Sequence, residues 1–92
     1  MILNVISAEY IADYKILLTF NNGESVLTDL EQTVKSDQRK IFYPLREIDY
    51  FKSFRIKLNT IIWPNEADFA PEFLLKLGRQ QKTENYLIQN LE

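Results

Sequence analysis

The chain has 92 residues, of which 46% are hydrophobic and 26% charged, a composition typical of one small globular domain rather than of a disordered segment. It contains no cysteine and no histidine, which excludes disulfides, thiolate zinc sites and catalysis by a serine–histidine or cysteine–histidine pair within this chain. Its net charge of −2 is too small to indicate a partner, and no apolar stretch approaches the roughly 18 residues that would span a bilayer.

The first third of the chain predicts a three-stranded antiparallel meander. Residues 2–8 are expected to form a strand rather than a signal peptide, because no basic segment precedes them, and this indicates a cytoplasmic protein. Residues 14–20 alternate in the manner of a strand, and Asn22-Gly23 follows at once. An Asn-Gly pair between two apolar runs predicts a hairpin, because both residues tolerate positive φ. The return strand is expected over residues 24–30.

The next segment is less regular. Residues 31–41 are polar and fit either a loop or a short helix. Leu45, Ile48 and Phe51 then recur at intervals of three, which predicts one or two helical turns. Pro44 suits the opening of such a turn, because its missing N–H would have no partner there.

A second hairpin is predicted from the alternating residues 54–58. Asn59-Thr60 is expected to be its turn and residues 61–63 its returning strand, which Pro64 ends.

The last predicted helix opens near Pro71 and runs to Leu77, with Gly78 as its left-handed cap. The elements together predict a small α+β domain over residues 1–78, in which a small antiparallel sheet, built from the N-terminal meander and the second hairpin, carries one or two short helices. Residues 79–92 are expected to be a C-terminal extension that holds a further short helix. An apolar stripe in this extension would pack on the domain's own core, on a second copy or on a partner helix: Tyr86, Leu87, Ile88 and Leu91.

Charge is unevenly distributed along the chain. Residues 35–57 carry seven bases and three acids, a net charge of +4, whereas residues 1–34 sum to −4 and residues 58–92 to −2. Bases interleaved with aromatic rings are typical of nucleic-acid surfaces, although the pI of 5.1 favours a solvated face or a patch for an acidic protein partner. The candidate contact residues are Arg39, Lys40, Arg46, Tyr50, Lys52, Arg55 and Lys57.

Three groups of residues resemble a known family. The first is Asp13-Tyr14-Lys15 with Leu17-Leu18-Thr19-Phe20 and Asn22-Gly23-Glu24. The second is Phe42-x-Pro44-Leu45 with Tyr50-Phe51 and Phe54-Arg55. The third is Ile61-Ile62-Trp63-Pro64-Asn65-x-Ala67-Asp68-x-x-Pro71-Glu72-x-Leu74. In this order and spacing they resemble the bacterial family known as domain of unknown function 2442, over roughly residues 3–77.

The resemblance implies a compact α+β domain and no established activity. Some relatives carry a helix-turn-helix domain after this module, but too few residues follow Gly78 here for such a unit. Other relatives lie beside a toxin-like small protein, which implies an antitoxin-like role. Glu66 stands where relatives usually have glycine, and Leu58-Asn59-Thr60 lacks the glycine that often marks the second hairpin, so both turns are expected to be shaped differently in this chain.

The only local cluster of side-chain oxygens comprises Asn65, Glu66, Asp68 and Glu72. Such oxygens suit Mg²⁺ or Ca²⁺, but their spacing matches no metal loop, and satisfaction of backbone N–H groups is the favoured interpretation, with Asp68 as the main structural residue. A lone tryptophan more often fills a core than lines a pocket. The structural motif is therefore Trp63, Pro64, Asn65, Asp68 and Pro71.

No pair of carboxylates or other catalytic constellation can be identified, so no catalytic residue, metal or cofactor is expected. The sequence predicts a non-catalytic binding module, regulatory or antitoxin-like, that acts through a protein partner or a homodimer without contacting a membrane. The alternative is a nucleic-acid-binding module that uses residues 39–57.

Overall fold

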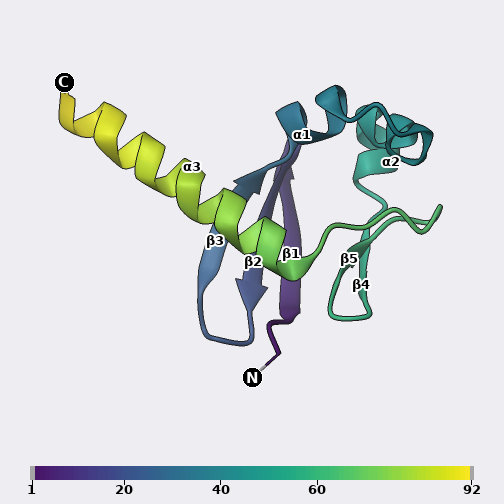
Figure 1. Cartoon of the computed structure of the whole chain (residues 1–92), viewed down its shortest axis with the longest axis horizontal. Coiled ribbons are helices and arrows are strands. Elements are labelled where there is room, and N and C mark those ends of the chain that lie inside the picture. Colours follow the sequence, from purple (N-terminus) through teal and green to yellow (C-terminus); the bar gives the residue numbers. More distant parts are fainter. Residues whose placement is uncertain (1, 92) are drawn as a thin grey trace.

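The computed structural model describes the backbone of residues 2–91 and the side chains of residues 2–85. It confirms an α+β domain with two antiparallel sheets, and it combines short helices with one long helix (Figure 1). In chain order the elements are β1 (Val5–Ala12), β2 (Lys15–Phe20), β3 (Ser25–Asp29), α1 (Glu31–Ser36), a 3₁₀ helix η1 (Lys40–Arg46), α2 (Ile48–Phe51), β4 (Arg55–Lys57), β5 (Thr60–Ile62) and α3 (Pro71–Leu91).

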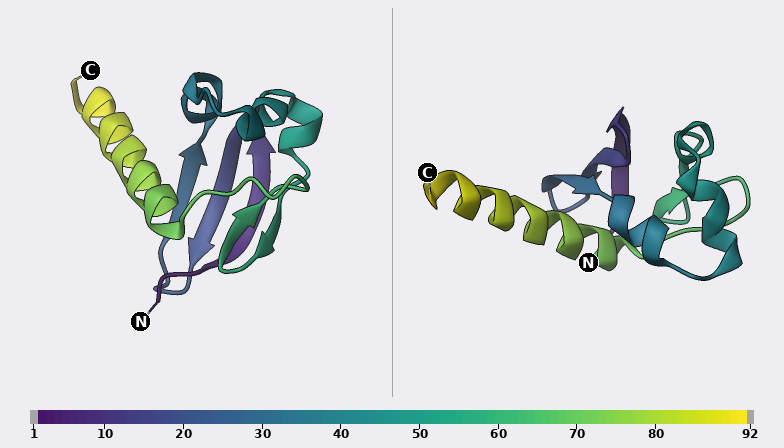
Figure 2. Two further views of the ribbon diagram at one scale, coloured as in Figure 1. Left: turned by 45° about the vertical axis from the view of Figure 1, so that its right-hand side comes forward. Right: turned by 90° about the horizontal axis from the view of Figure 1, so that it is seen from above.

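The predicted meander forms the main sheet, with the strand order β1-β2-β3, while β4 and β5 form a separate ribbon beside β1 (Figure 2). Alternation along β2 and β3 turns one face of the sheet inward, and this face carries Ile16, Leu18, Phe20 and Val26, all buried. Helix α3 packs on β3. The opposite face exposes Ile11 and Leu27, among others.

The core is aromatic at its centre. Trp63 is 1% exposed, and its indole N–H donates a hydrogen bond to the carbonyl of Phe51 at 2.8 Å. Its ring lies 5.6 Å from that of Phe51 and 5.8 Å from that of Phe69, measured between centroids. The tryptophan therefore belongs to the core, as its position at the end of a strand predicted.

The β2–β3 hairpin is confirmed, but its turn differs from the predicted one. Only Gly23 takes a positive φ, at +86°, whereas the Asn22 side chain accepts a hydrogen bond from the N–H of Glu24. The N–H of Gly23 donates to the carbonyl of Phe20, and the N–H of Phe20 donates to the carbonyl of Glu24. Four residues, 21–24, separate the two strands, which is a longer connection than a two-residue Asn-Gly turn.

The turn after Trp63 repeats this pattern. The N–H of Glu66 donates to the carbonyl of Trp63, and the N–H of Trp63 donates to the carbonyl of Ala67. Glu66 therefore occupies the position that Gly23 holds in the first turn, and its φ is +70°. Since glycine adopts this conformation at the lowest cost, the geometry explains why a glycine would suit position 66.

The second hairpin is also confirmed, with its turn one residue earlier than predicted. Leu58 and Asn59 form the two-residue loop and have φ values of +53° and +74°, while Thr60 already belongs to β5. Positive φ at both central residues is the arrangement of a type I′ turn, which matches the twist of the flanking strands.

The segment 31–41 includes helix α1, and Pro44 lies inside η1 rather than at the opening of a helical turn. Proline has no N–H to donate to the carbonyl of Ile41, three residues earlier, and the Asn65 side chain donates to that carbonyl at 2.8 Å instead. The expected helical turn follows as α2.

Helix α3 begins at Pro71 as predicted, but Gly78 does not cap it, and the helix runs on through the expected domain boundary at residue 78. Packing against β3 explains why a glycine stands inside the helix. A Cβ built on Gly78 would lie 2.5 Å from Cγ2 of Val26 and 2.9 Å from Oγ1 of Thr28. Glycine thus lets the helix approach β3 closely. The predicted apolar stripe of Tyr86, Leu87, Ile88 and Leu91 lies outside the residues whose side chains are described.

Two side-chain contacts hold this close approach further along the helix. Gln81 accepts a hydrogen bond from the N–H of Asp29 and donates one to its carbonyl, both at 2.9 Å, so its carboxamide pairs with the edge of β3 as a neighbouring strand would. Arg79 donates two hydrogen bonds to the carboxylate of Glu24, which lowers the pKa of that group.

Candidate interaction surfaces

The tip of the β4–β5 hairpin combines exposure with backbone strain. The Leu58 side chain is 76% exposed, the highest value among the large hydrophobic residues described, although its φ lies in the left-handed region that disfavours branched side chains. The carbonyl of Asn59 accepts a hydrogen bond from the N–H of Val5, which fixes the tip against β1. Leu58 is thus held in place without being buried.

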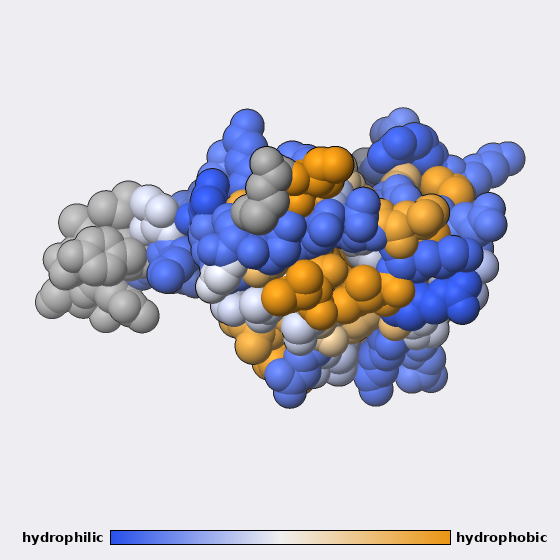
Figure 3. Space-filling model, turned by 90° about the horizontal axis from the view of Figure 1, so that it is seen from below, coloured by the Kyte–Doolittle hydropathy of each residue, from blue (hydrophilic) through white to orange (hydrophobic). Residues whose placement is uncertain are grey.

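The N-terminal segment reaches the same end of the domain. The Asn21 side chain accepts a hydrogen bond from the N–H of Asn4 and donates one to the carbonyl of Ile2. Ile2 is 74% exposed and Ile6, on β1, is also exposed. Viewed at this end, apolar residues gather near the centre and hydrophilic residues surround them (Figure 3).

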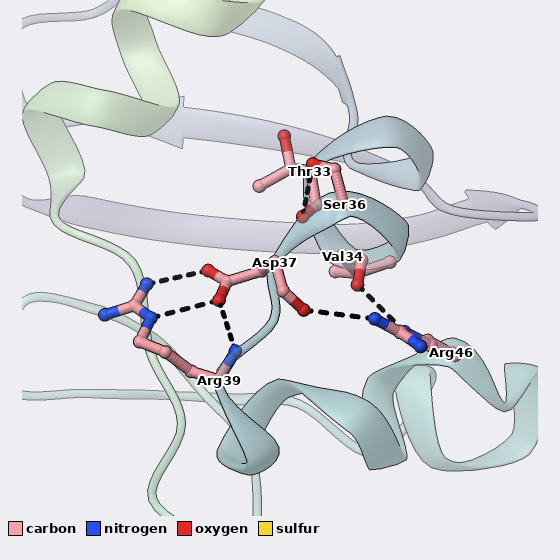
Figure 4. A network of polar contacts seen from close by, with 6 residues as sticks. All are labelled: Thr33, Val34, Ser36, Asp37, Arg39 and Arg46. Carbon is pink, nitrogen blue, oxygen red and sulfur yellow. Dashed lines mark hydrogen bonds and ion pairs between the residues drawn. The ribbon is translucent and has the colours of Figure 1, made fainter.

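The basic residues of segment 35–57 divide between internal and surface roles. Arg46 donates hydrogen bonds to the carbonyls of Val34 and Asp37 (Figure 4). It also donates to the carbonyl of Lys35, and so satisfies the carbonyl groups at the end of α1. Arg39 donates to both carboxylate oxygens of Asp37, at 3.0 and 2.7 Å. Both guanidinium groups thus hold the connection between α1 and η1.

The Asp37 carboxylate predicts a specific acid response. Hydrogen bonds from the Arg39 side chain and backbone lower the pKa of Asp37 from 3.8 to about 2. The carboxylate therefore contributes stability that is fully present above about pH 4 and is lost as the pH falls through about 2. We expect a carboxyl titration followed by NMR to show a midpoint near 2 that moves toward 3.8 in Arg39→Gln. An unchanged midpoint in that variant would contradict the assigned cause.

The other candidate contact residues make fewer contacts within the domain. Tyr50 accepts a hydrogen bond from the N–H of Asn65, and the Lys52 ammonium lies 5.3 Å from the ring centroid of Tyr10. Lys40, Arg55 and Lys57 are exposed and make no ion pair within residues 2–85. Arg55 and Lys57 both belong to β4, so the hairpin carries two exposed cations next to Leu58.

Within the motif 63–71, Asn65 rather than Asp68 is the main structural side chain. Its carboxamide accepts a hydrogen bond from the N–H of Ala67 and donates one to the carbonyl of Ile41, which ties this turn to η1. The Asp68 backbone bridges to Ile62, but its carboxylate makes no hydrogen bond or ion pair to any side chain or backbone group between residues 2 and 85. The Asn65 side chain thus satisfies the backbone N–H in this turn, which is the role expected of the motif.

Among the described residues, no group of three or more carboxylate, histidine or cysteine side chains is arranged to hold a metal ion. In the same part of the chain, no helix has the length and apolar character needed to cross a membrane.

A protein-family model described as a protein of unknown function (DUF2442) matches residues 5–80. The chain belongs to the DUF2442 family. This match covers the sheet, the aromatic core and the first half of α3. Neither a comparison with curated proteins nor one with solved structures finds a significant match. Membership of DUF2442 assigns no activity to the chain, so the chemistry of its surface is the basis for a proposed function.

Proposed function

We propose that this DUF2442 chain is a non-catalytic, cytoplasmic binding module, regulatory or antitoxin-like, and that it contacts another protein through the β4–β5 hairpin. The observation that carries the proposal is Leu58, a large apolar side chain that is 76% exposed at a φ of +53°. Asparagine or glycine would form the same turn with less strain and no exposed apolar surface.

Strain of this kind clusters at binding sites, because a residue that weakens the free fold is retained where it gains contacts elsewhere. A left-handed leucine costs on the order of 1 kcal/mol. Burial of its side chain in a partner would return about 1.5–3 kcal/mol. The balance favours a Leu58 that is buried in a complex.

The residues around the tip indicate the chemistry of the partner. Arg55 and Lys57 precede Leu58 on β4, and Ile56 between them is 43% exposed. Exposed apolar side chains that share a hairpin with two cations suit a small apolar pocket whose rim carries carboxylates. The partner is therefore expected to present an acidic surface.

The test uses two measurements that should move in opposite directions. The product of the gene adjacent to this one is the partner to try first, with affinity measured by calorimetry. Leu58→Asn is expected to raise the free energy of unfolding by about 0.5–1 kcal/mol, because strain is relieved. The same variant should weaken binding by at least about tenfold, as expected for a central apolar contact.

Leu27→Asn is the matched control, because Leu27 is 47% exposed on the open face of the main sheet and lies away from the hairpin tip. It should leave affinity unchanged. The proposal would be contradicted if wild type and Leu58→Asn bound the partner with equal affinity, or if the wild-type chain did not bind it. The nucleic-acid alternative would gain support instead if the chain shifted an oligonucleotide in a mobility assay with an affinity that fell steeply as salt rose.

A further inference from the structure

A groove of about 540 Å³ lies between α1, the residues that follow it and the start of α3. It is separate from the hairpin tip and carries two kinds of lining. One wall is aromatic, from Phe69 and Phe73, and the rest holds hydroxyl groups and charges. The polar lining residues are Thr33, Ser36, Asp37, Arg39 and Asp68.

The aromatic wall belongs to a stack of three rings. Phe42 and Phe69 are nearly parallel, at 22° with centroids 5.1 Å apart, and Phe69 and Phe73 likewise, at 24° and 5.7 Å. Phe42 and Phe69 are buried, whereas Phe73 is 42% exposed. A planar group that enters the groove would find the Phe73 ring available for stacking.

The chain itself shows which planar group suits this environment. The Arg39 guanidinium lies 4.5 Å from the centroid of Phe42 while it donates two hydrogen bonds to the Asp37 carboxylate. An aromatic face and a carboxylate together thus hold one guanidinium in this region. Phe73 and Asp68 line the same groove and offer the same two chemical groups, and the Asp68 carboxylate makes no ion pair with any residue from 2 to 85.

We propose that this groove binds the guanidinium group of an arginine side chain from another protein. Asp68 accepts hydrogen bonds from the guanidinium, and Phe73 stacks on its plane. The Arg39 guanidinium in the groove is already paired with the Asp37 carboxylate, so the charge available among the lining residues is that of Asp68, which favours a cation and disfavours phosphate. A protein side chain therefore fits the groove better than a nucleotide does. Arginine suits it better than lysine, because only arginine is planar and can donate two parallel hydrogen bonds to one carboxylate.

The experiment titrates the full ¹⁵N-labelled chain with N-acetyl-arginine amide, and in parallel with its citrulline and lysine counterparts. We expect saturable shift changes at the amides of Ser36, Asp68 and Phe73. The dissociation constant should be at least about tenfold higher for citrulline, which has the same shape without the charge. Asp68→Asn should raise the constant for the arginine probe by a similar factor, and Phe73→Leu by about two- to fivefold.

Glu72→Gln is the matched control, because Glu72 is an exposed carboxylate at the start of the same helix but does not line the groove. The dissociation constant of Glu72→Gln for the arginine probe should stay within twofold of the wild-type value. Equal effects of Asp68→Asn and Glu72→Gln would show general charge attraction and overturn the proposal. The proposal would also be overturned if the shift changes did not saturate, or if the citrulline probe bound as tightly as the arginine probe. Tighter binding of adenosine monophosphate at the same amides would overturn it as well. The amide spectrum of each variant establishes that it is folded before titration.

Discussion

Trp63→Ala is expected to lower the free energy of unfolding by about 3–5 kcal/mol, the range for removing a buried aromatic side chain. The change would leave a cavity against Phe51 and Phe69, and it would leave the Phe51 carbonyl without its hydrogen bond from the indole. A domain of this size has little more stability than that to lose. Urea unfolding followed by far-UV circular dichroism would measure the change, because the fluorescent residue is itself removed.

Two variants separate the causes. Trp63→Phe keeps most of the apolar volume and removes the N–H donor, so it should cost less than Trp63→Ala. Leu27→Ala removes apolar atoms from a side chain that is already 47% exposed and should cost under about 1 kcal/mol. If Trp63→Ala cost no more than Leu27→Ala, the placement of the indole in the core would be wrong.

Gly78→Ala is expected to destabilise the domain by about 2–3 kcal/mol, near the upper end of the usual cost of overpacking. Helix propensity alone predicts the opposite, a gain of about 1 kcal/mol, because alanine replaces glycine inside a helix. Packing wins because the new methyl group would lie 2.5 Å from Cγ2 and 2.7 Å from Cβ of Val26, a stiff, buried residue. Thermal or urea unfolding would give the sign directly.

A double-mutant cycle tests the cause of that loss. Val26→Ala removes Cγ2, the atom nearest the new methyl group, and leaves Cβ in place. The pair Gly78→Ala with Val26→Ala should therefore be less destabilising than the sum of the two single changes. Gln80→Ala, on the exposed side of α3, should change stability by less than about 0.5 kcal/mol. Additive losses in the cycle would show that α3 does not press on β3 at this position.

The candidate surfaces were only partly predictable from the sequence. The density of bases in segment 35–57 predicted a charged surface, yet Arg46 donates to backbone carbonyls at and just after the end of α1. The role of Leu58 depends on a positive φ, and leucine carries no local signal for that conformation, unlike Asn22-Gly23. The groove unites α1 with the start of α3, residues more than thirty positions apart.

Composition and local pattern by themselves determined the α+β class, both hairpins, the burial of Trp63 and the start of α3 at Pro71, because alternation, turn residues and proline act through neighbours in the chain. The tertiary structure alone decided that Gly78 lies inside a helix, that Asn65 rather than Asp68 holds its turn, and that Leu58 projects from a strained tip. These outcomes depend on which atoms of distant elements meet, such as Gly78 with Val26, and a single chain's local pattern does not contain that information. The absence of cysteine and histidine limits the chemistry of the chain. The fold adds two surfaces on which to test binding, the tip of the β4–β5 hairpin and the groove at the start of α3.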